Sequence, residues 1–442
     1  MKWKYRSIKL AFKRCIEFKN RSQFMEPSSC QIFDEDFSGL TGSGFFKGKR
    51  FLLLTHELSY TGAPLLLMET AQMLIDEGAI VKLVSPYRGH KKWSLFRKRL
   101  KLAHEHNIPV VPFSSISKHL LTSDFVIANT VTEKVMGAVD EIIKQTPDVI
   151  KKLIIWVHEI DVERYLPFSA NINACSLRIF DSQACKDAWE EHIGVVQNSV
   201  VIHPSISPQM FEKLSDNRPK FSHLPTSCRP KNTHRSTRKE IRSMLGVGDN
   251  DFLVLCLGTI SDRKGQAILL DTLSKISGDF GGRIKLCLVG FKNARRIKKF
   301  FFNMTEGERT VLAPERAYVS QTEIAAFYIA ADVFVMNSQG ENKGRGECFG
   351  RVTVEAMAAG LAVLGTSAGG TSEIIINEKS GYLFPPGTEG QAVLTHQIKS
   401  LINNPEKAVS LGLAARKYAL ENFNHLKFLR ELEAVVATIS QN

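Results

Sequence analysis

Paired cysteines are missing from this chain of 442 residues. Its 8 cysteines are scattered, and no two of them have the C-x-x-C spacing that is typical of zinc and redox sites. Cys256 and Cys287 lie inside apolar runs, where a reduced cysteine packs as a small hydrophobic side chain. These observations argue against a cysteine-based metal site and favour a reducing compartment such as the cytoplasm.

Long apolar runs are missing as well. No stretch approaches the roughly 20 apolar residues that are needed to cross a bilayer. Basic residues also interrupt the first twenty positions so closely that they leave no room for the hydrophobic core of a signal peptide. We therefore expect neither a membrane span nor secretion by way of a signal peptide.

Acidic residues are the minority among the charged ones. Lys and Arg total 58 against 45 Asp and Glu, which gives a net charge of +13. This excess predicts attraction to an anionic partner, and it does not choose among a phospholipid surface, nucleic acid and a phosphorylated ligand. The hydrophobic share of 43% and charged share of 23% are typical of globular proteins and exclude a fibrous or wholly disordered chain.

Strand-like runs alternate with amphipathic stretches of helical length in both halves of the chain. This pattern is typical of βαβ units, so we predict an α/β fold with parallel sheets. Strands are expected at 51–56, 80–86, 124–130, 152–158, 177–182, 199–204, 252–258, 284–290, 332–338 and 361–367. Helices are expected at 64–76 and, as a terminal pair, over 405–439.

The length predicts two domains, because single cores rarely grow beyond about 250–300 residues. Residues 209–240 are polar, contain proline and have few large aliphatic side chains, which is typical of a linker or a surface insertion. We therefore divide the chain into a basic extension (1–49), a first doubly wound domain (50–208), the linker, a second such domain (241–422) and a final helix (423–442). We expect the final helix to pack back towards the first domain.

The segment from Gly346 to Ile374 is the richest in chemical features. It contains GECFGRVTVEAMAAG, which predicts a loop ending at Glu347, a helix from about Phe349, a helix end at Gly360 and then a buried strand. In a parallel sheet such a helix start faces the crevice at the carboxyl ends of the strands, where free backbone amides favour a phosphate.

Glu347 and Glu355 are candidate ligand-binding acids. Eight residues separate them, which corresponds to about 12 Å along a helix. That distance exceeds the about 5–9.5 Å between the two carboxyls of a glycosidase. It suits the two ends of a long ligand, such as a sugar and a ribose on either side of a diphosphate. The alternative is that Glu355 is an ordinary solvated residue on a helix surface.

Other strand-end loops carry further candidates. In LCLGTISDRKG at 255–265, Arg263 and Lys264 follow a buried strand and could neutralise a diphosphate leaving group, or they could form an ordinary basic surface loop. Gly62 follows another strand and could let backbone approach a ligand closely, although an ordinary flexible turn explains it equally well. His158 ends the strand IIWVH at the same kind of edge, where a lone histidine is more often structural.

Taken together these segments resemble the retaining nucleotide-sugar transferases of glycosyltransferase family 4. The shared features are W-V-H-E, the loop G-T-I-x-x-R-K-G and an E-x7-E helix that ends in E-A-M-A-A-G. The resemblance covers about 50–422 and is most specific over 252–387. It implies the GT-B fold, in which two Rossmann-like doubly wound parallel-sheet domains face a cleft, and a nucleotide-diphosphate-sugar donor held mainly by the second domain. It further implies that neither a cofactor nor a metal is required.

The resemblance also implies roles for individual residues. Glu347 would lie near the donor sugar hydroxyls, Glu355 at the ribose, Arg263 and Lys264 on the diphosphate, and His158 near the transferred sugar. Glu347, Lys264, Arg263 and His158 are thus the expected catalytic residues. The further expected donor contacts are Gly62, Gly258, Thr259, Cys348, Phe349, Gly350 and Val352. Many family members have Arg where this chain has Thr259, so more of the phosphate contact would fall on the two cations.

A reaction on one face of the sugar is implied too. The acceptor hydroxyl would lose its proton towards the leaving phosphate, without a protein nucleophile, and the acceptor would be a glycan, a glycolipid or a lipid-linked intermediate. Two segments that mix cations with aromatic rings, 1–20 and 88–101, predict peripheral binding to an anionic membrane at its cytoplasmic face. Their alternative is a disordered tail and a solvated helix face. We expect no nucleic-acid partner.

Two other functions remain open at this point. GTSAG at 365–369 matches the G-x-S-x-G motif of esterases, with Ser367 as nucleophile and with acids and histidines following in triad order, but no H-G-G-G-type oxyanion segment accompanies it. A catalytically silent nucleotide-sugar-binding protein on the same fold is the second alternative. GSGFFKG at 42–48 precedes its strand, and its glycine spacing is wrong for a dinucleotide-binding motif.

Overall fold

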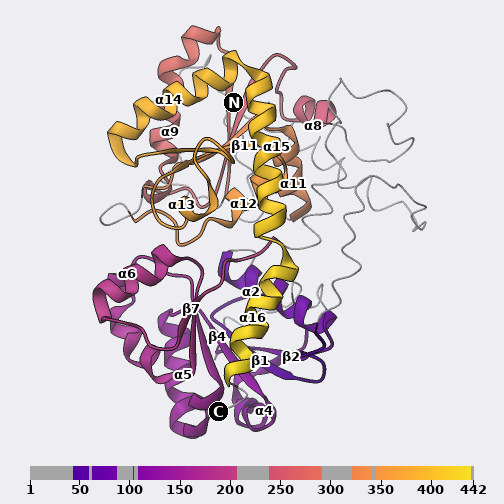
Figure 1. Ribbon diagram of the computed structural model, residues 1–442, viewed down its shortest axis with the longest axis vertical. Helices are drawn as coiled ribbons and strands as arrows, with labels where there is room; N and C mark the ends of the chain where they lie inside the picture. The colour runs from indigo at the N-terminus through magenta and orange to yellow at the C-terminus, as the bar shows by residue number, and fades with distance from the viewer. Residues whose placement is uncertain are drawn as a thin grey trace, which may run out of the picture.

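The computed structural model describes residues 43–58, 62–86, 103, 108–206, 238–290, 321–339 and 345–439. The segments 1–20 and 88–101, in which membrane binding is predicted, lie outside the described residues, as does most of the expected linker. The chain forms two lobes, each built around its own sheet (Figure 1).

The first lobe contains a parallel sheet of seven strands in the order β3-β2-β1-β4-β5-β6-β7. Its strands are β1 (Arg50–Thr55), β2 (Ile80–Ser85), β3 (Val110–Pro112), β4 (Phe125–Asn129), β5 (Leu153–Val157), β6 (Leu177–Phe180) and β7 (Ser199–Val201). β1 lies between β2 and β4, so that Leu53 is in register with Leu83 on one side and with Ile127 on the other. The interiors of the central strands are apolar because helices cover both faces of the sheet.

The helices of the first lobe are α2 (Gly62–Asp76), α4 (Ile116–Thr122), α5 (Glu133–Gln145) and α6 (Gln183–Ile193). Short 3-10 turns lie at Phe113–Ser115, Pro147–Lys152, Val162–Arg164 and Leu166–Ala174. α2 packs on the face that carries Leu53, whereas α4, α5 and α6 pack on the face that carries Leu52 and Leu54. Side-chain direction alternates along a strand, so neighbouring leucines of β1 serve opposite cores.

The second lobe contains a parallel sheet of five strands in the order β12-β11-β10-β8-β9. Its strands are β8 (Phe252–Leu257), β9 (Ile284–Val289), β10 (Val333–Met336), β11 (Ala362–Thr366) and β12 (Tyr382–Phe384). Its helices are α8 (Arg238–Met244), α9 (Gln266–Ser277), α11 (Gln321–Ala330), α12 (Arg351–Ala358), α13 (Thr371–Ile374), α14 (Gly387–Asn403) and α15 (Pro405–Asn422), with 3-10 turns at Asp262–Lys264 and Gly278–Phe280.

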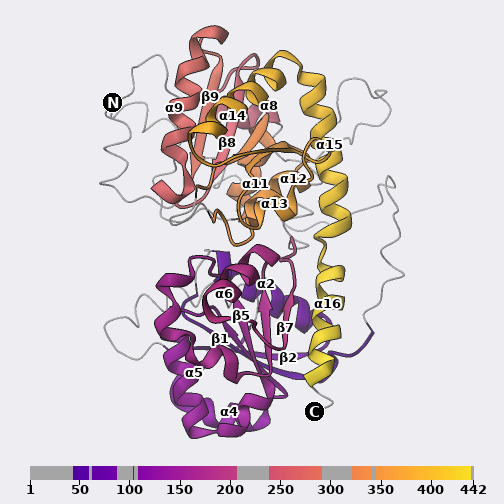
Figure 2. The same ribbon diagram turned by 60° about the vertical axis from the view of Figure 1, so that its left-hand side comes forward.

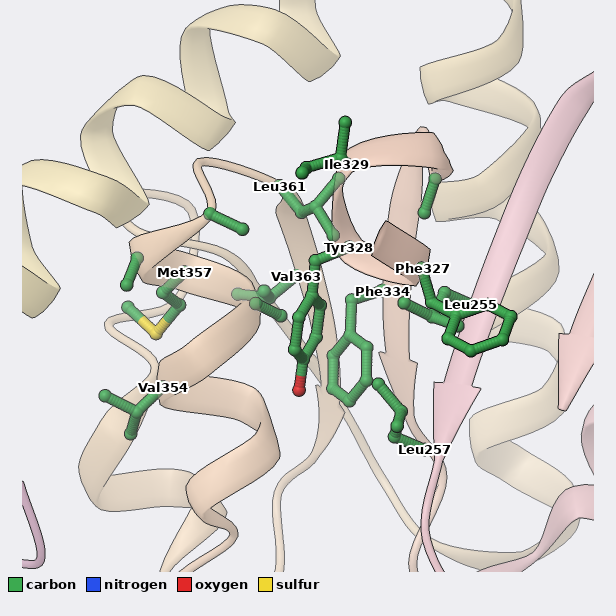
Figure 3. Packing of buried hydrophobic residues seen from close by; sticks show 14 of the residues in the cluster. Leu255, Leu257, Phe327, Tyr328, Ile329, Phe334, Val354, Met357, Leu361 and Val363 are labelled. Atoms are coloured by element: carbon green, nitrogen blue, oxygen red, sulfur yellow. The ribbon is translucent and has the colours of Figure 1, made fainter. Parts of the chain in front are cut away.

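The core of the second lobe also lies on both faces of its sheet. Leu253, Leu255 and Leu257 pack with α8, α11, α12 and α15, whereas Val254 and Cys256 pack with α9 and α14. Figure 3 shows part of the first of these clusters, with Leu255 and Leu257 near Phe334. Each domain thus has three layers, in which a parallel sheet lies between helices.

The last helix, α16 (His425–Ile439), leaves the second lobe and lies along the first (Figures 1 and 2). Phe428, Leu429, Leu432 and Val436 belong to the core cluster of the first lobe, and the Phe428 ring stacks on Trp156 with centroids 5.8 Å apart. Next to this crossing, the Ile206 amide donates to the Phe423 carbonyl at 3.0 Å. The segments around Ile206 and Phe423, which are far apart in the sequence, therefore lie side by side where the two lobes meet.

Three expectations about the elements need correction. The short strands β3 and β12 were not predicted, since each has only three residues with weak alternation. α8 begins at Arg238, inside the segment expected to be a linker, because the Arg238 guanidinium binds the Asp332 carboxylate and the Ala331 carbonyl. α12 begins at Arg351 rather than at about Phe349, because Gly350 has a φ of +98° and precedes the first helical residue.

None of the described helices is both long enough and apolar enough to span a membrane.

Candidate active site

Strand order determines where a ligand crevice can form in the second lobe. The order reverses between β8 and β10, and in open α/β sheets ligands bind at such a switch point, at the carboxyl ends of the strands. The loop after β8 carries Arg263 and Lys264, and the chain after β10 holds this loop. The Asn337 side-chain amide donates to the Gly265 carbonyl at 2.7 Å, and the Gln339 backbone amide donates to the Arg263 carbonyl at 2.7 Å.

Gly265 is required at this position. It has a φ of +61°, and a Cβ atom there would lie 2.1 Å from the Asn337 carbonyl oxygen. A side chain would therefore push the loop away from β10. The close packing of two loops at the switch point fixes the direction in which the two cations point.

Both cations point at Glu347. Lys264 Nζ lies 2.5 Å from Glu347 Oε1, and Arg263 Nη1 lies 3.8 Å from the same oxygen. All three side chains are at most 25% exposed, so the alternative of an ordinary basic surface loop is wrong. Burial alone would raise the pKa of Glu347, but Lys264, Arg263 and a hydrogen bond from Ser338 outweigh burial and lower this pKa to about 2. The carboxylate is therefore ionised at neutral pH.

The GTSAG motif and the glycine after it support the loop that carries Glu347. Gly369 and Glu347 form a parallel bridge, and the Gly370 amide donates to the Glu347 carbonyl at 2.9 Å. The Ser367 hydroxyl donates to the Phe384 carbonyl rather than to a histidine or a carboxylate. The motif thus supports the backbone next to Glu347. Among the described residues, no hydrogen bond joins Ser367 to a histidine or a carboxylate, so the nucleophile–base contact that an esterase requires is missing.

Replacement of Gly370 by Ala is expected to destabilise the protein by about 1–3 kcal/mol, the usual cost of overpacking. A Cβ atom at Gly370 would lie 2.2 Å from the Cys348 carbonyl oxygen and 2.7 Å from Phe349 Cα. Gly278 is a matched control, because its φ of −59° is close to the −62° of Gly370 and nothing lies within 4 Å of its Cβ position. Urea unfolding of both variants tests this, and equal stability of Gly370→Ala and Gly278→Ala would contradict the packing described here.

Glu355 lies on α12 and is buried, with 5% of its surface exposed, so the alternative of a solvated helix residue is wrong. The Tyr328 hydroxyl donates to Glu355 Oε2 at 2.9 Å. Burial raises the pKa of Glu355 to about 7; the nearby Glu69 adds to the rise, whereas Arg351 and the Tyr328 hydrogen bond oppose it. A buried carboxyl whose pKa is shifted to near neutrality is typical of a functional site.

The first lobe contributes residues that face α12. Arg351, the first residue of α12, forms an ion pair with Glu69 of α2. Gly62 is the first residue of α2 and is exposed, with nothing within 4 Å of the position that a Cβ would take. Among the described residues, none fills the space beside Gly62, and the middle of α2 is tied to the second lobe through Glu69.

His158 is held at both ring nitrogens. Its Nδ1 lies 2.7 Å from Asp181 Oδ2, and its Nε2 lies 2.7 Å from Asn129 Oδ1. The amide of Asn129 donates through Nδ2 to the Ala63 carbonyl, which leaves Oδ1 as the acceptor facing the histidine. Because both partners accept, this geometry favours the imidazole form in which both ring nitrogens carry hydrogen. Burial alone would lower the pKa of His158, but Asp181 outweighs burial and raises it.

The remaining expected donor contacts lie along the same loops. The Cys348 carbonyl accepts a hydrogen bond from the Ser182 hydroxyl, and the Val352 carbonyl accepts one from Tyr328. The Phe349 ring is 3% exposed and stacks on His203 with centroids 5.4 Å apart. Gly258, with a φ of +142°, and the exposed Thr259 follow β8 directly, and Gly350 precedes α12. The expected donor residues of the second lobe therefore line one edge of its sheet.

Charged contacts hold this edge against the first lobe. Glu373 accepts hydrogen bonds from the backbone amides of Gln183 and Ala184, both at 2.8 Å, and lies 3.0 Å from His203. These amides belong to the first turn of α6, where the helix dipole favours a carboxylate. The half-buried Arg345 reaches Glu163 of the first lobe at 2.9 Å.

Several residues that shape the site were not predicted from the sequence. Asn337 and Ser338 directly follow the strand β10, and the strand-end argument used for Arg263 would have found them. Glu69 and Tyr328 lie inside apolar helices, where nothing in the local pattern distinguishes them. Within the part of the chain that the structure describes, no group of three or more His, Cys, Asp or Glu side chains is placed to hold a metal ion.

Two family models match the chain. The model described as glycosyl transferases group 1 matches residues 237–418, and the model of glycosyl-transferase family 4 matches residues 47–217. Among solved structures, HepE from Anabaena in complex with UDP and glucose is similar with a TM-score of 0.68 and 21% identity, over 88% of this chain and all of that one.

Curated relatives match the chain over part of its length. One is the GDP-mannose-dependent alpha-(1-6)-phosphatidylinositol monomannoside mannosyltransferase of Mycolicibacterium smegmatis, 27% identical over 42% of this chain and 47% of that protein. Another is the lipopolysaccharide 1,2-N-acetylglucosaminetransferase of Salmonella typhimurium, 30% identical over 42% of this chain and 50% of that protein. The chain spans about half the length of these relatives. By its two family models and its two-sheet architecture, it belongs to glycosyltransferase family 4, the glycosyl transferases group 1, and has the GT-B fold.

Proposed function

We propose that this chain is a glycosyltransferase that moves a sugar from a nucleotide-diphosphate sugar to a hydroxyl acceptor. The observation that carries the proposal is the cluster of Glu347, Lys264 and Arg263 at the switch point of the second sheet. An ionised carboxylate next to two cations matches a ligand with hydroxyl donors on one side and a diphosphate on the other.

The two cations take the diphosphate in this proposal. Lys264 and Arg263 stabilise the negative charge that develops on the leaving diphosphate, and electrostatic stabilisation of this kind is commonly the largest catalytic term. Glu347, which its ion pairs with Lys264 and Arg263 keep ionised against the effect of burial, accepts hydrogen bonds from the sugar hydroxyls. The amides of Phe349 and Gly350 lie beside it for the sugar and phosphate, and Gly62 approaches the phosphates from the first lobe.

The reaction proceeds on one face of the sugar. The acceptor oxygen forms a bond to the anomeric carbon as the bond from this carbon to the diphosphate oxygen breaks, and the acceptor proton passes to the leaving diphosphate. The chain supplies no covalent nucleophile and requires no metal. His158, whose ring protons are both committed to Asp181 and Asn129, acts near the transferred sugar as a fixed cation rather than as a proton carrier.

The relatives narrow the donors and acceptors to be tested. One is named for GDP-mannose and a phosphatidylinositol mannoside, another for a lipopolysaccharide, and HepE is found with UDP and glucose. We therefore propose a UDP- or GDP-linked hexose as donor, and a glycan, glycolipid or lipid-linked intermediate of polysaccharide or glycoconjugate synthesis as acceptor. The basic segments 1–20 and 88–101 would bind the anionic cytoplasmic face of a membrane where such acceptors lie.

Nucleotide binding should appear in a thermal shift experiment. We expect UDP, GDP or ADP, or one of their sugar conjugates, to raise the melting temperature by several degrees. A nucleotide at 100 times its Kd stabilises the folded state by about 2.7 kcal/mol. Free hexose and inorganic phosphate at the same concentration serve as controls, and a folded protein that responds to no nucleotide of the panel would contradict the proposed function.

A further inference from the structure

Glu355, the carboxylate that we propose for the ribose, is held from a neighbouring helix. Tyr328 of α11 is fully buried, and its hydroxyl bonds Glu355 Oε2 at 2.9 Å and the Val352 carbonyl at 3.0 Å. Its ring stands between Val363 and Phe334 in the core, which fixes the hydroxyl (Figure 3). No hydrogen bond from the described residues reaches the other oxygen, Oε1, which leaves it for a ligand hydroxyl.

A buried ion pair joins the same helix to the other domain. Arg351 lies four residues before Glu355, so the two side chains share one face of α12. The Arg351 guanidinium binds Glu69 of α2, and the two side chains are only 13% and 7% exposed. The pair is part of the contact between the lobes, because α2 belongs to the first lobe and α12 to the second.

We propose that Tyr328, Arg351 and Glu69 are positioning residues for Glu355, with Tyr328 holding one carboxylate oxygen and the Arg351–Glu69 pair setting the local charge from the opposite domain. Since Glu355 is assigned to the ribose, this inference rests on the proposed function. The donor site is then completed by both lobes, because Glu69 meets Arg351 only when α2 lies against α12. Arg351 contacts Glu69 of the first lobe and acts on the charge of Glu355 in the second, so it couples nucleotide binding to the contact between the domains.

The groups around Glu355 act on its pKa in opposite directions. Burial raises this pKa to about 7, Arg351 on the same helix lowers it, Glu69 from α2 raises it and the hydrogen bond from Tyr328 of α11 lowers it. α15 brings Arg416 to the far end of α12, where the guanidinium binds the Ala358 carbonyl. An ionised carboxylate accepts stronger hydrogen bonds than a protonated one, so affinity for the donor should fall as the pH falls through about 7.

Two conservative variants should move this pH dependence in opposite directions. Tyr328→Phe removes a hydrogen bond that favours the ionised form, so its midpoint should rise by about one pH unit and affinity at pH 7 should weaken by about fivefold. Glu69→Gln removes a negative charge but keeps an acceptor for Arg351, so its midpoint should fall by a similar amount and affinity at pH 6 should improve by about fivefold.

The measurement is calorimetric titration with the nucleotide sugar that the thermal shift panel selects, between pH 5.5 and 8.5. A nucleotide sugar is suitable because its diphosphate, esterified at both ends, does not titrate in this range. Tyr382→Phe and Glu133→Gln are matched controls at residues other than Glu355 and its three positioning residues, and their midpoints should equal that of the parent. Opposite shifts would support the positioning role, since loss of packing alone weakens binding at every pH.

A second readout observes Glu355 without ligand. Infrared difference spectra between pH 5.5 and 8.5 should contain a protonated carboxyl band that is absent in Glu355→Gln and whose midpoint moves with the two variants as above. Unmoved midpoints, or midpoints that move in the same direction, would overturn the inference. If the parent binds the nucleotide sugar normally while the midpoints stay in place, the positioning role fails and the proposed function stands; if the parent binds no nucleotide sugar, both fail.

Discussion

Replacement of Lys264 by Ala is expected to reduce sugar transfer by about 10²-fold or more, comparable to the loss of one preorganised oxyanion donor. Lys264 Nζ lies 2.5 Å from Glu347, and its side chain is only 15% exposed, so its removal takes a positioned cation out of the site. Arg263 lies 3.8 Å from the same carboxylate and would keep part of the phosphate contact. The measurement is the initial rate of nucleoside diphosphate release in the presence of acceptor.

Lys275→Ala is the matched control for this experiment. Lys275 lies on α9, is 65% exposed and pairs with Asp271 one turn away on the same helix. Its removal should leave the rate unchanged, because exposed pairs of this kind contribute little. Circular dichroism establishes that both variants are folded. A folded Lys264→Ala protein with a rate within a factor of two of the parent would remove Lys264 from the active site.

The two glutamates are expected to divide binding and chemistry between them. Glu347→Ala should spare the binding of the free nucleotide and reduce transfer by about 10²–10³-fold, because contacts to the sugar are lost in the transition state. Glu355→Ala should weaken binding of the nucleotide itself by about tenfold, the usual consequence of losing a hydrogen bond to a charged group. Calorimetric titration with the nucleoside diphosphate separates the two effects from the rate of transfer.

Glu355→Gln is a useful companion to these variants, because it keeps the shape of the side chain and an acceptor for Tyr328. Its affinity for the nucleotide sugar should no longer depend on pH around 7, whereas that of Glu347→Ala should keep the dependence of the parent. If Glu355→Ala binds the nucleotide as tightly as the parent does, the assignment of Glu355 to the ribose is wrong.

The long buried strands could be predicted from the sequence, because a parallel sheet that is covered on both faces produces continuous runs such as FLLL and FLVLCL. The strands at 110–112 and 382–384 could not, since three residues at a sheet edge carry too little of either pattern. The start of α8 was hidden for another reason. It depends on contacts between Arg238 and the chain around Asp332, which local sequence does not reveal.

Part of the site could also be predicted. The expectation that residues after neighbouring strands meet at one edge was sufficient to bring Arg263 and Lys264 towards Glu347. The burial of Glu355 could not be decided from spacing, because a helix of that composition has the same periodicity whether its carboxylate faces solvent or Tyr328. Glu69 is 282 residues from Arg351 in the sequence, and only the packing of the two lobes shows that they pair.

The pKa values could not have been predicted either. Glu347 and Glu355 belong to the same motif, yet the pKa of the first is lowered to about 2 and that of the second is raised to about 7. The difference follows from the partners, since two cations surround Glu347, whereas Glu355 shares its one cation with Glu69. Sequence spacing identifies such acids, and only their surroundings determine which charge each carries.

The most direct test of catalysis at this site is release of nucleoside diphosphate from the nucleotide sugar that stabilises the protein, with a glycan and a lipid-linked acceptor mixture present. We predict steady release that depends on the acceptor, appears together with a new sugar-acceptor bond by mass spectrometry, and falls by about 10²-fold in Lys264→Ala. A protein that binds the nucleotide sugar tightly but releases no more nucleoside diphosphate than Lys264→Ala would contradict the account, and it would identify the chain as a silent nucleotide-sugar-binding protein.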